Sequence, residues 1–584
     1  MRGDLRLGDW IVSPRRECIR RGGDSVHVHP KPMAVLQRLA EAGGEVVTRE
    51  ELFEAVWPGV IVTDDALTQC IVELRKAFGD SARQQAVIQT VPKVGFRLVP
   101  SVRREGVEEP VIAVLPFVNM SSDPEQEYFS DGISEELINL LAKTPGLRVI
   151  SHTSAFSFKQ RPTAIPEIAR QLGVSHVLEG SVRKSGDRVR ITAQLVETRS
   201  DTHLWSRNYD RDLAEIFAIQ DDIARRVVRK VRVTLLRDMP RSAPVDPEAY
   251  RLFLLGRSRL NAYDFPAALD NFRRSIAIEP NFAQGHVAIA ACFGARTFFG
   301  ELPPKDGYAR ISEALQRATD CDGGAAEVDR PLAEKHFYYD WDWAKAEAAF
   351  KRALERVPSD AHCYQLYAWF LTAMRRWDEA RERIGRSLEL EPLSPSVYLT
   401  ASNIEYFAGC HSRAIDHCRR ALEFSPEHPL ALSQMGWSFL QTGDFESALA
   451  VMERSVQIAP DNSYFRWLLG YAYAVTGRVD GAREMIRDLH ARSQRQYVVP
   501  FGFAVIHAGL GEFDVALAWL EKAYEERNGW MVYLDVAPSL DPLRGEPRFR
   551  RLLADMRFPG SGATQSAGNS TSSGSGSSRT PKAS

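Results

Sequence analysis

A period of 34 residues runs through the second half of this 584-residue chain and limits what it can fold into. Four prolines keep the spacing: Pro358, Pro392, Pro426 and Pro460. An alanine stands twelve residues before each of them, and a larger side chain stands eight residues before. Small residues let two helices cross closely, larger ones fill the gap, and a proline ends the second helix. The period therefore predicts stacked pairs of helices.

The same frame fits Gly256, Ala268, Phe272 and Pro280, whereas residues 283–330 follow it loosely. The pattern resembles the tetratricopeptide repeat. That resemblance implies an all-α solenoid over residues 245–525 whose concave groove binds a protein or peptide. A purely structural spacer is the alternative. We expect a C-terminal helical cap over 526–558 and, because 559–584 are rich in Gly and Ser, a disordered tail there.

Composition excludes a polyanion-binding character for the whole chain, since the formal net charge is only −2. A nucleic-acid site would have to be local. The seven cysteines are scattered, no CxxC pair occurs, and no signal peptide opens the sequence. The apolar runs fall far short of the roughly 20 residues of a membrane helix. We expect a cytoplasmic protein without a membrane span.

Residues 1–100 predict strands, three helices and then a hairpin. The third helix, 63–78, carries Leu67, Ile71, Leu74 and Phe78 as one apolar stripe. Before it, "TREELFEAVWP" has a capping box at Thr48 and Glu51, and "PKPMAVLQRLAEAGG" reads as a helix ended by glycines. The hairpin is "TVPKVGFRL", residues 90–98.

This order, with "VVTREELFEAVWP", "LRKAFGD" and "TVPKVGFRL" in place, resembles the winged-helix domain of OmpR/PhoB-type transcription regulators. The resemblance implies an α+β fold in which the third helix enters the major groove of DNA and the hairpin wing reaches an adjacent minor groove. It also implies that the loop between the second and third helices, with Val60 and Ile61, can contact RNA polymerase. Packing of these two residues within the domain is the alternative.

Physical chemistry distributes roles over this surface. Thr68, Gln69, Val72 and Glu73 lie opposite the apolar stripe and are candidates for reading base edges, with Glu73 suited to a cytosine amino group. Arg75, Lys76, Lys93 and Arg97 are candidates for phosphate contacts, with Lys93 at the wing tip. For each of them, an ordinary solvated surface residue is the alternative. Residues 1–104 hold sixteen Lys and Arg against thirteen Asp and Glu, so we expect weak binding by a monomer and a homodimer on paired half-sites.

After a charged linker, 101–110, residues 111–236 alternate strand-like and helix-like segments and resemble the TolB-like amino-terminal domain, an α/β module. Asp131, Glu135 and Glu136 stand near a predicted helix start, where acids stabilise the helix dipole. We predict no catalytic site, cofactor or metal. The segment "CHSRAIDHC" (410–418) offers thiolates and imidazoles, but Cys418 falls at a repeat packing position, which favours structural cysteines over zinc ligands.

These patterns together predict a multidomain, one-component transcription regulator that binds double-stranded DNA. Its signal or partner input would come from the middle domain and the repeats. A second hypothesis is a scaffold or adaptor built on the repeats, with no sequence-specific DNA role. A third hypothesis is a cyclase-like enzyme, but the sequence shows no two-metal aspartate site. Binding of residues 1–104 to DNA separates the first two.

Overall fold

The computed structural model describes residues 5–559, apart from 22–23, 43, 45, 60–61, 82–84, 93, 100–101, 105–108, 122, 124–125, 187, 232–244, 262–263, 299–300 and 322–327. This part of the chain separates into two compact units between Pro110 and Val111. The expected tail lies almost wholly outside the described residues.

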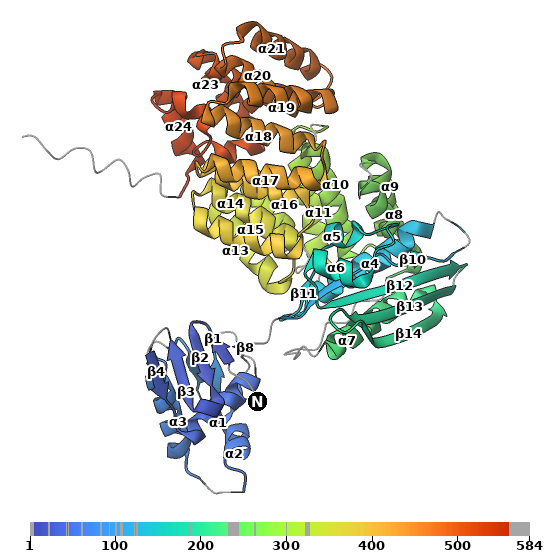
Figure 1. Ribbon diagram of the computed structural model, residues 1–584, viewed down its shortest axis with the longest axis vertical. Coiled ribbons are helices and arrows are strands. Elements are labelled where there is room, and N and C mark those ends of the chain that lie inside the picture. Colours follow the sequence, from blue (N-terminus) through green and yellow to red (C-terminus); the bar gives the residue numbers. More distant parts are fainter. Residues whose placement is uncertain are drawn as a thin grey trace, which may run out of the picture. The chain divides into compact units, whose positions relative to one another are not determined.

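The N-terminal unit pairs two small sheets with three helices (Figure 1). Its five-stranded antiparallel sheet has the order β4-β3-β2-β1-β8, and a three-stranded sheet has the order β5-β7-β6. The strands are β1 (Leu5–Leu7), β2 (Trp10–Ser13), β3 (Cys18–Arg21), β4 (Asp24–His27), β5 (Val47–Thr48), β6 (Ile88–Val91), β7 (Gly95–Leu98) and β8 (Val102–Arg104). The helices are α1 (Pro30–Glu41), α2 (Arg49–Val56) and α3 (Asp64–Ala77), with a 3₁₀ turn, η1, at Pro14–Arg16.

Sequence patterning accounts for these helices. The predicted capping box is present: Thr48 accepts from the backbone N–H of Glu51, and the Glu51 carboxylate accepts from the N–H of Thr48. The predicted apolar stripe of the third helix is confirmed, because Leu67, Ile71 and Leu74 are buried against α1 and the sheets.

The middle domain is an α/β layer on a mixed sheet of order β11-β9-β12-β13-β14, with β10 paired to β12. β9 is parallel to β11 and β12, and β12, β13 and β14 are antiparallel. Helices α5 and α6 pack on the face that carries Val111, Ala113 and Val177. The elements are β9 (Val111–Val114), β10 (Val118–Asn119), α4 (Glu127–Ala142), β11 (Arg148–Val149), α5 (His152–Phe156), α6 (Ile165–Leu172), β12 (His176–Ser185), β13 (Arg188–Glu197), β14 (Thr202–Asp212), η3 (Leu213–Glu215) and α7 (Ile216–Lys230).

Antiparallel helix pairs make up most of the rest of the described chain (Figure 1). They are α8 (Pro247–Asn261), α9 (Phe265–Ile278), α10 (Ala283–Phe298), α11 (Pro304–Asp320), α12 (Asp329–Lys335), α13 (Trp343–Arg356), α14 (Ala361–Ala373), α15 (Trp377–Leu390), α16 (Pro395–Phe407), α17 (His411–Phe424), α18 (Pro429–Thr442), α19 (Phe445–Ile458), α20 (Ser463–Val475), α21 (Val479–Ser493), α22 (Pro500–Gly509) and α23 (Phe513–Glu525). A π-helical turn, η5 (His336–Asp340), precedes α13, and η6 (Gly529–Tyr533), η7 (Pro538–Leu543) and α24 (Pro547–Met556) follow α23.

The 34-residue frame has the packing that its residue types predict. Ala346, Ala380, Ala414 and Ala448 are fully buried. A Cβ on Gly256 would lie 2.5 Å from the ring of Phe272, so the first helix of that repeat needs glycine at the crossing. Helices α13, α15, α17 and α19 each end two residues before the periodic proline. No helix of the described residues is both long and apolar enough to cross a membrane.

Candidate nucleic-acid interface

Helix α3 presents a polar face to solvent on the side opposite the core. Thr68, Gln69, Val72 and Lys76 are exposed and follow each other at helical spacing, and Val72 is 53% exposed. The Thr68 hydroxyl donates to the carbonyl of Asp64 over 2.9 Å, which leaves its lone pairs free to accept. The face combines an amide, a hydroxyl and an apolar branch. These are groups that can distinguish base edges in a major groove.

Glu73 does not belong to this free face, and its role as a base reader stays a prediction. Its Oε1 accepts from the backbone N–H of His29 over 2.8 Å and lies 2.9 Å from His29 Nδ1. Burial by itself raises the pKa of this carboxyl, but the hydrogen bonds from His29 outweigh it and leave the pKa lowered. The carboxylate therefore fastens α3 to the residue that caps α1.

Arg75 is also held within the domain, and its role as a phosphate contact stays a prediction. Its Nη2 donates to the carbonyl of Ile88 over 2.9 Å and to the Thr90 hydroxyl over 2.8 Å. Both acceptors belong to β6, the first strand of the wing. Arg75 thus joins the exposed helix to the hairpin, and the two elements are held in one geometry.

Lys76 and Arg97 keep their side chains in solvent beside this face. Lys76 lies in the last turn of α3, and the Nε of Arg97, on β7, donates to the amide oxygen of Gln89 over 2.7 Å. The remaining cation and the two apolar loop residues that the sequence singled out, Lys93, Val60 and Ile61, lie outside the described residues.

The wing is positioned by a glycine whose role the sequence pattern did not reveal. Gly95 opposes Thr48 in the pairing of β7 with β5. A Cβ at this position would lie 1.9 Å from the carbonyl oxygen of Val47, a distance that no side chain can occupy. Glycine is therefore required for β5 and β7 to pair, and the pairing fixes the base of the hairpin.

Asp80 organises the turn between α3 and the wing. One carboxylate oxygen accepts from the N–H groups of Ser81 and Ala86, and the other accepts from those of Val87 and Ile88. Burial raises the pKa of this group, but the four hydrogen bonds dominate and lower it. An aspartate directly after a helix-ending glycine is a recognisable turn signal, although the sequence does not reveal its partners.

The acidic residues of the middle domain form a buried charge cluster instead of capping a helix. Glu135 and Glu136 lie well inside α4, which begins at Glu127, so their predicted role at a helix start is wrong. Arg257 of α8 pairs with both, and His152 Nε2 lies 2.9 Å from Glu135 Oε1. Burial raises the pKa of Glu136, whereas Arg257 and His152 overcome the same effect at Glu135 and lower its pKa.

A cavity of about 150 Å³ opens beside this cluster, between α4, α5 and α8. Asp131 also borders it and is paired with Lys159, at 2.6 Å. The cluster therefore joins the middle domain to the first repeat helices. Arg257 lies 121 residues from Glu136 along the chain, so no local sequence pattern indicates this contact.

The cysteines and histidines of residues 410–418 are dispersed. The Cys418 Sγ lies 3.0 Å from the Ser402 hydroxyl, and burial raises the pKa of this thiol to about 12. Among the residues that the structure describes, no group of three or more His, Cys, Asp or Glu side chains could hold a metal ion.

Comparison with known proteins bears on each domain. The family "Transcriptional regulatory protein, C terminal" matches residues 23–98, which hold α3 and the wing. The N-terminal unit is an OmpR/PhoB-type winged-helix domain. The family "HilA/YgeH-like transcriptional regulator, second domain" matches residues 108–226, and "Tetratricopeptide repeat" matches 340–402 and 439–498. The tetratricopeptide assignment is thus confirmed, whereas the middle domain matches the HilA/YgeH family and its TolB-like identity stays a prediction.

Three relatives extend these matches. A Rhizobium meliloti protein whose name carries the words adenylate cyclase 3 is 38% identical over 258 residues, which are 41% of this chain and 43% of that protein. Transcriptional regulator HilA of Salmonella typhimurium is 23% identical over 73% of this chain and 77% of its own length. Transcriptional activator CadC of Escherichia coli is 40% identical over 96 residues, or 16% of this chain and 19% of CadC. The chain is therefore homologous to transcriptional regulators with a winged-helix domain, while it spans under half of the first of these relatives.

Proposed function

We propose that this chain is a one-component transcriptional regulator. Its winged-helix domain binds double-stranded DNA, with α3 in the major groove and the wing against the neighbouring backbone. The observation that carries the proposal is the α3 face itself. Thr68, Gln69 and Val72 are exposed on a helix whose partner hairpin is fixed to it by Arg75, so the two can meet one duplex as a unit.

Within the proposal, Gln69 has the leading role in base reading, because a glutamine amide can donate to and accept from an adenine edge. Lys76, Lys93 and Arg97 are assigned to phosphates, which fix affinity and register. The modest positive charge of residues 1–104 supports binding as a dimer on paired half-sites. Contact of Val60 and Ile61 with RNA polymerase would then convert occupancy into regulation.

The second unit supplies the input in this scheme. The middle domain, whose TolB-like identity we retain as part of the proposal, is joined to the repeats by the Arg257 cluster. A signal or protein partner that displaces the repeats would therefore change the contacts of the middle domain. The proposal assigns the chain no catalytic step, and DNA binding places it in the cytoplasm with the chromosome.

The test compares specific and random DNA across a salt series. Genomic crosslinking of the full chain first supplies a bound fragment. Lys76→Ala should weaken binding to that fragment and to a random duplex alike, and should reduce the slope of log K against log salt by about 0.9. Gln69→Ala should lose about 1–3 kcal/mol on the specific fragment and almost nothing on the random one.

Arg21→Ala is the matched control, since Arg21 is an exposed cation on β3, outside α3 and the wing, and should change neither quantity. Equal losses by Gln69→Ala on both duplexes would remove base reading from α3. If the full chain bound no duplex at low ionic strength, the scaffold hypothesis would replace the regulator.

A further inference from the structure

The repeats from α13 onward close on themselves through their two ends. The Trp343 Nε1, at the start of α13, donates to the carbonyls of Met556 and Arg557 at 3.1 and 3.0 Å, and its ring stacks on Phe558 at 5.1 Å. The Trp341 ring lies 5.2 Å from that of Tyr524. These side-chain contacts join the two ends of α13–α24, and we call this set of helices the ring.

One segment that does not follow the 34-residue period lies against the inside of this ring. We call residues 528–545 the strap; it contains η6 and η7. Most of its side chains between 531 and 540 are buried, and Met531, Val532, Leu534, Leu540 and Leu543 are fully buried. An ordinary capping segment buries one face, whereas the strap is surrounded on several sides. The predicted helical cap over 526–558 thus has only one α-helix, α24.

Two aromatic side chains of the strap pack against aromatic side chains of the repeat helices. Trp530 stacks on Tyr464 at 5.5 Å and on Phe501 at 6.1 Å. Tyr533 stacks on Phe407 at 5.3 Å with an interplanar angle of 8°, and meets the edge of Trp369 at 5.5 Å. These four partners come from α20, α22, α16 and α14, each the first helix of its repeat. The strap therefore occupies the groove that the first helices share, the place expected to take a protein or peptide.

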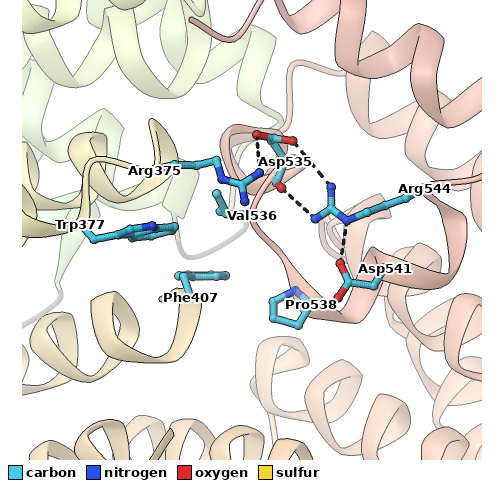
Figure 2. Close-up of a pocket in the computed structure, with 8 residues that line it drawn as sticks. All are labelled: Arg375, Trp377, Phe407, Asp535, Val536, Pro538, Asp541 and Arg544. Atoms are coloured by element: carbon cyan, nitrogen blue, oxygen red, sulfur yellow. Dashed lines mark hydrogen bonds and ion pairs between the residues drawn. The ribbon is translucent and has the colours of Figure 1, made fainter. Parts of the chain in front are cut away.

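A charged pin holds the middle of the strap at the edge of this groove. Figure 2 shows Arg375 reaching Asp535 from one side and Arg544 reaching it from the other, at 3.6 Å each. Arg544 Nη2 also donates to the Asp535 carbonyl over 2.8 Å. A cavity of about 380 Å³, bordered by Trp377, Phe407 and Pro538, remains beside the pin, so the strap does not fill this end of the groove.

Arg375 itself is a departure from the repeat pattern. Its backbone is left-handed, with φ 59°, and the equivalent position in the next four repeats is glycine: Gly409, Gly443, Gly477 and Gly511. A non-glycine residue in this region carries conformational strain. This repeat thus accepts a strained turn and, through it, gains a guanidinium that reaches the strap.

We infer that the inner groove of the repeats is a binding site for an aromatic segment in a 3₁₀ turn and that the strap is its resident occupant. The recognised pattern is an aromatic residue, a second aromatic residue three positions later and an acid two positions after that, as in Trp530, Tyr533 and Asp535. Flat rings supply large contact area at low entropic cost, and the acid meets Arg375. A partner that uses this groove has to carry the same pattern and displace the strap.

The first experiment adds the strap in trans. A labelled peptide of residues 526–546 is titrated into the full chain and into the double variant Trp530→Ala with Tyr533→Ala. The peptide should bind the double variant at least tenfold more tightly than the native chain, whose groove is occupied. A control peptide with the same two alanines should not bind either protein. Equal affinity of the native peptide for both proteins, or binding to neither folded protein, overturns the inference.

A second variant keeps the inference testable if the double variant does not fold. Arg375→Gly removes the half of the pin that lies outside the strap and restores the glycine of the neighbouring repeats, so the turn itself loses its strain. Hydrogen exchange should then become about two- to fivefold faster in the strap amides, with helices α13 to α23 unchanged, since an exposed ion pair contributes little. Unchanged strap exchange, or exchange of strap and helices together in one step, would make the strap part of the ring's core and not its ligand. Neither experiment depends on DNA binding.

Discussion

Replacement of Gly95 by alanine tests whether the base of the wing is as crowded as the structure indicates. The added Cβ would lie 1.9 Å from the Val47 carbonyl oxygen, 2.8 Å from the Val47 carbonyl carbon and 2.9 Å from the Thr48 Cα. All three atoms belong to backbone, so no side chain can rotate away. Relief requires β5 and β7 to separate, and that pairing involves only two residue pairs.

The expected cost is the loss of this pairing together with overpacking, about 2–4 kcal/mol of unfolding free energy for the N-terminal unit. Chemical denaturation of the full chain measures this loss of unfolding free energy. The fluorescence of Trp10 and Trp57 reports the unfolding of the N-terminal unit, and single-tryptophan variants serve as controls. Affinity for DNA should also fall, because the hairpin loses its support.

Gly59→Ala is the control, since Gly59 has φ +73° and open space around its Cβ position. It should cost only the left-handed conformation, about 1 kcal/mol. If Gly95→Ala were no more destabilising than this control, the close approach of β7 to β5 would be wrong.

Three further predictions concern other parts of the chain. Asp80→Asn should lower the unfolding free energy of the N-terminal unit by about 1–3 kcal/mol at pH 7. Because the folded-state pKa of Asp80 is lowered, this difference should be complete above the unfolded pKa of about 3.9 and should vanish as the pH falls through the folded-state pKa. A difference in denaturation midpoint that does not change with pH would contradict the role of Asp80. Arg257→Met should cost about 3–5 kcal/mol in the second unit because it leaves two carboxylates buried without their partner, and adding Glu136→Gln should recover part of that loss; calorimetry that finds no such recovery would exclude the charge cluster as the cause. Trp343→Phe should speed hydrogen exchange in α24 by about tenfold, through loss of the hydrogen bond to Met556 and Arg557, and unchanged exchange would show that this contact does not close the ring.

Regular packing was readable from the sequence, because it repeats. The alanines of the 34-residue frame face helix crossings, and Leu67, Ile71 and Leu74 face a core, since periodicity alone decides which side of a helix is buried. Solvent exposure of Thr68, Gln69 and Val72 follows from the same rule. Whether these residues contact DNA remains a prediction.

Pairwise partners were not readable. Nothing local shows that Glu73 meets His29, which is 44 residues away, or that Arg75 reaches the strand after the next turn. Glu73 was predicted to read bases and Arg75 to contact phosphates, because charge at a surface position is usually free. The pairing of Glu136 with Arg257 was equally hidden, since Arg257 lies more than a hundred residues along the chain. The position of the strap in the groove was not predicted because its residues do not follow the 34-residue period.

The meeting of Trp343 with Phe558 changes how the helical half should respond to damage. Open solenoids fray from their terminal units, and their stability is nearly a sum over neighbours. The contact between the two ends leaves no free terminal repeat at this point, so local unfolding that starts there should cost more free energy. Removing a single 34-residue unit would leave the two sides of the seam unable to meet. Length variation, which open solenoids tolerate, should therefore be poorly tolerated between these two aromatic residues.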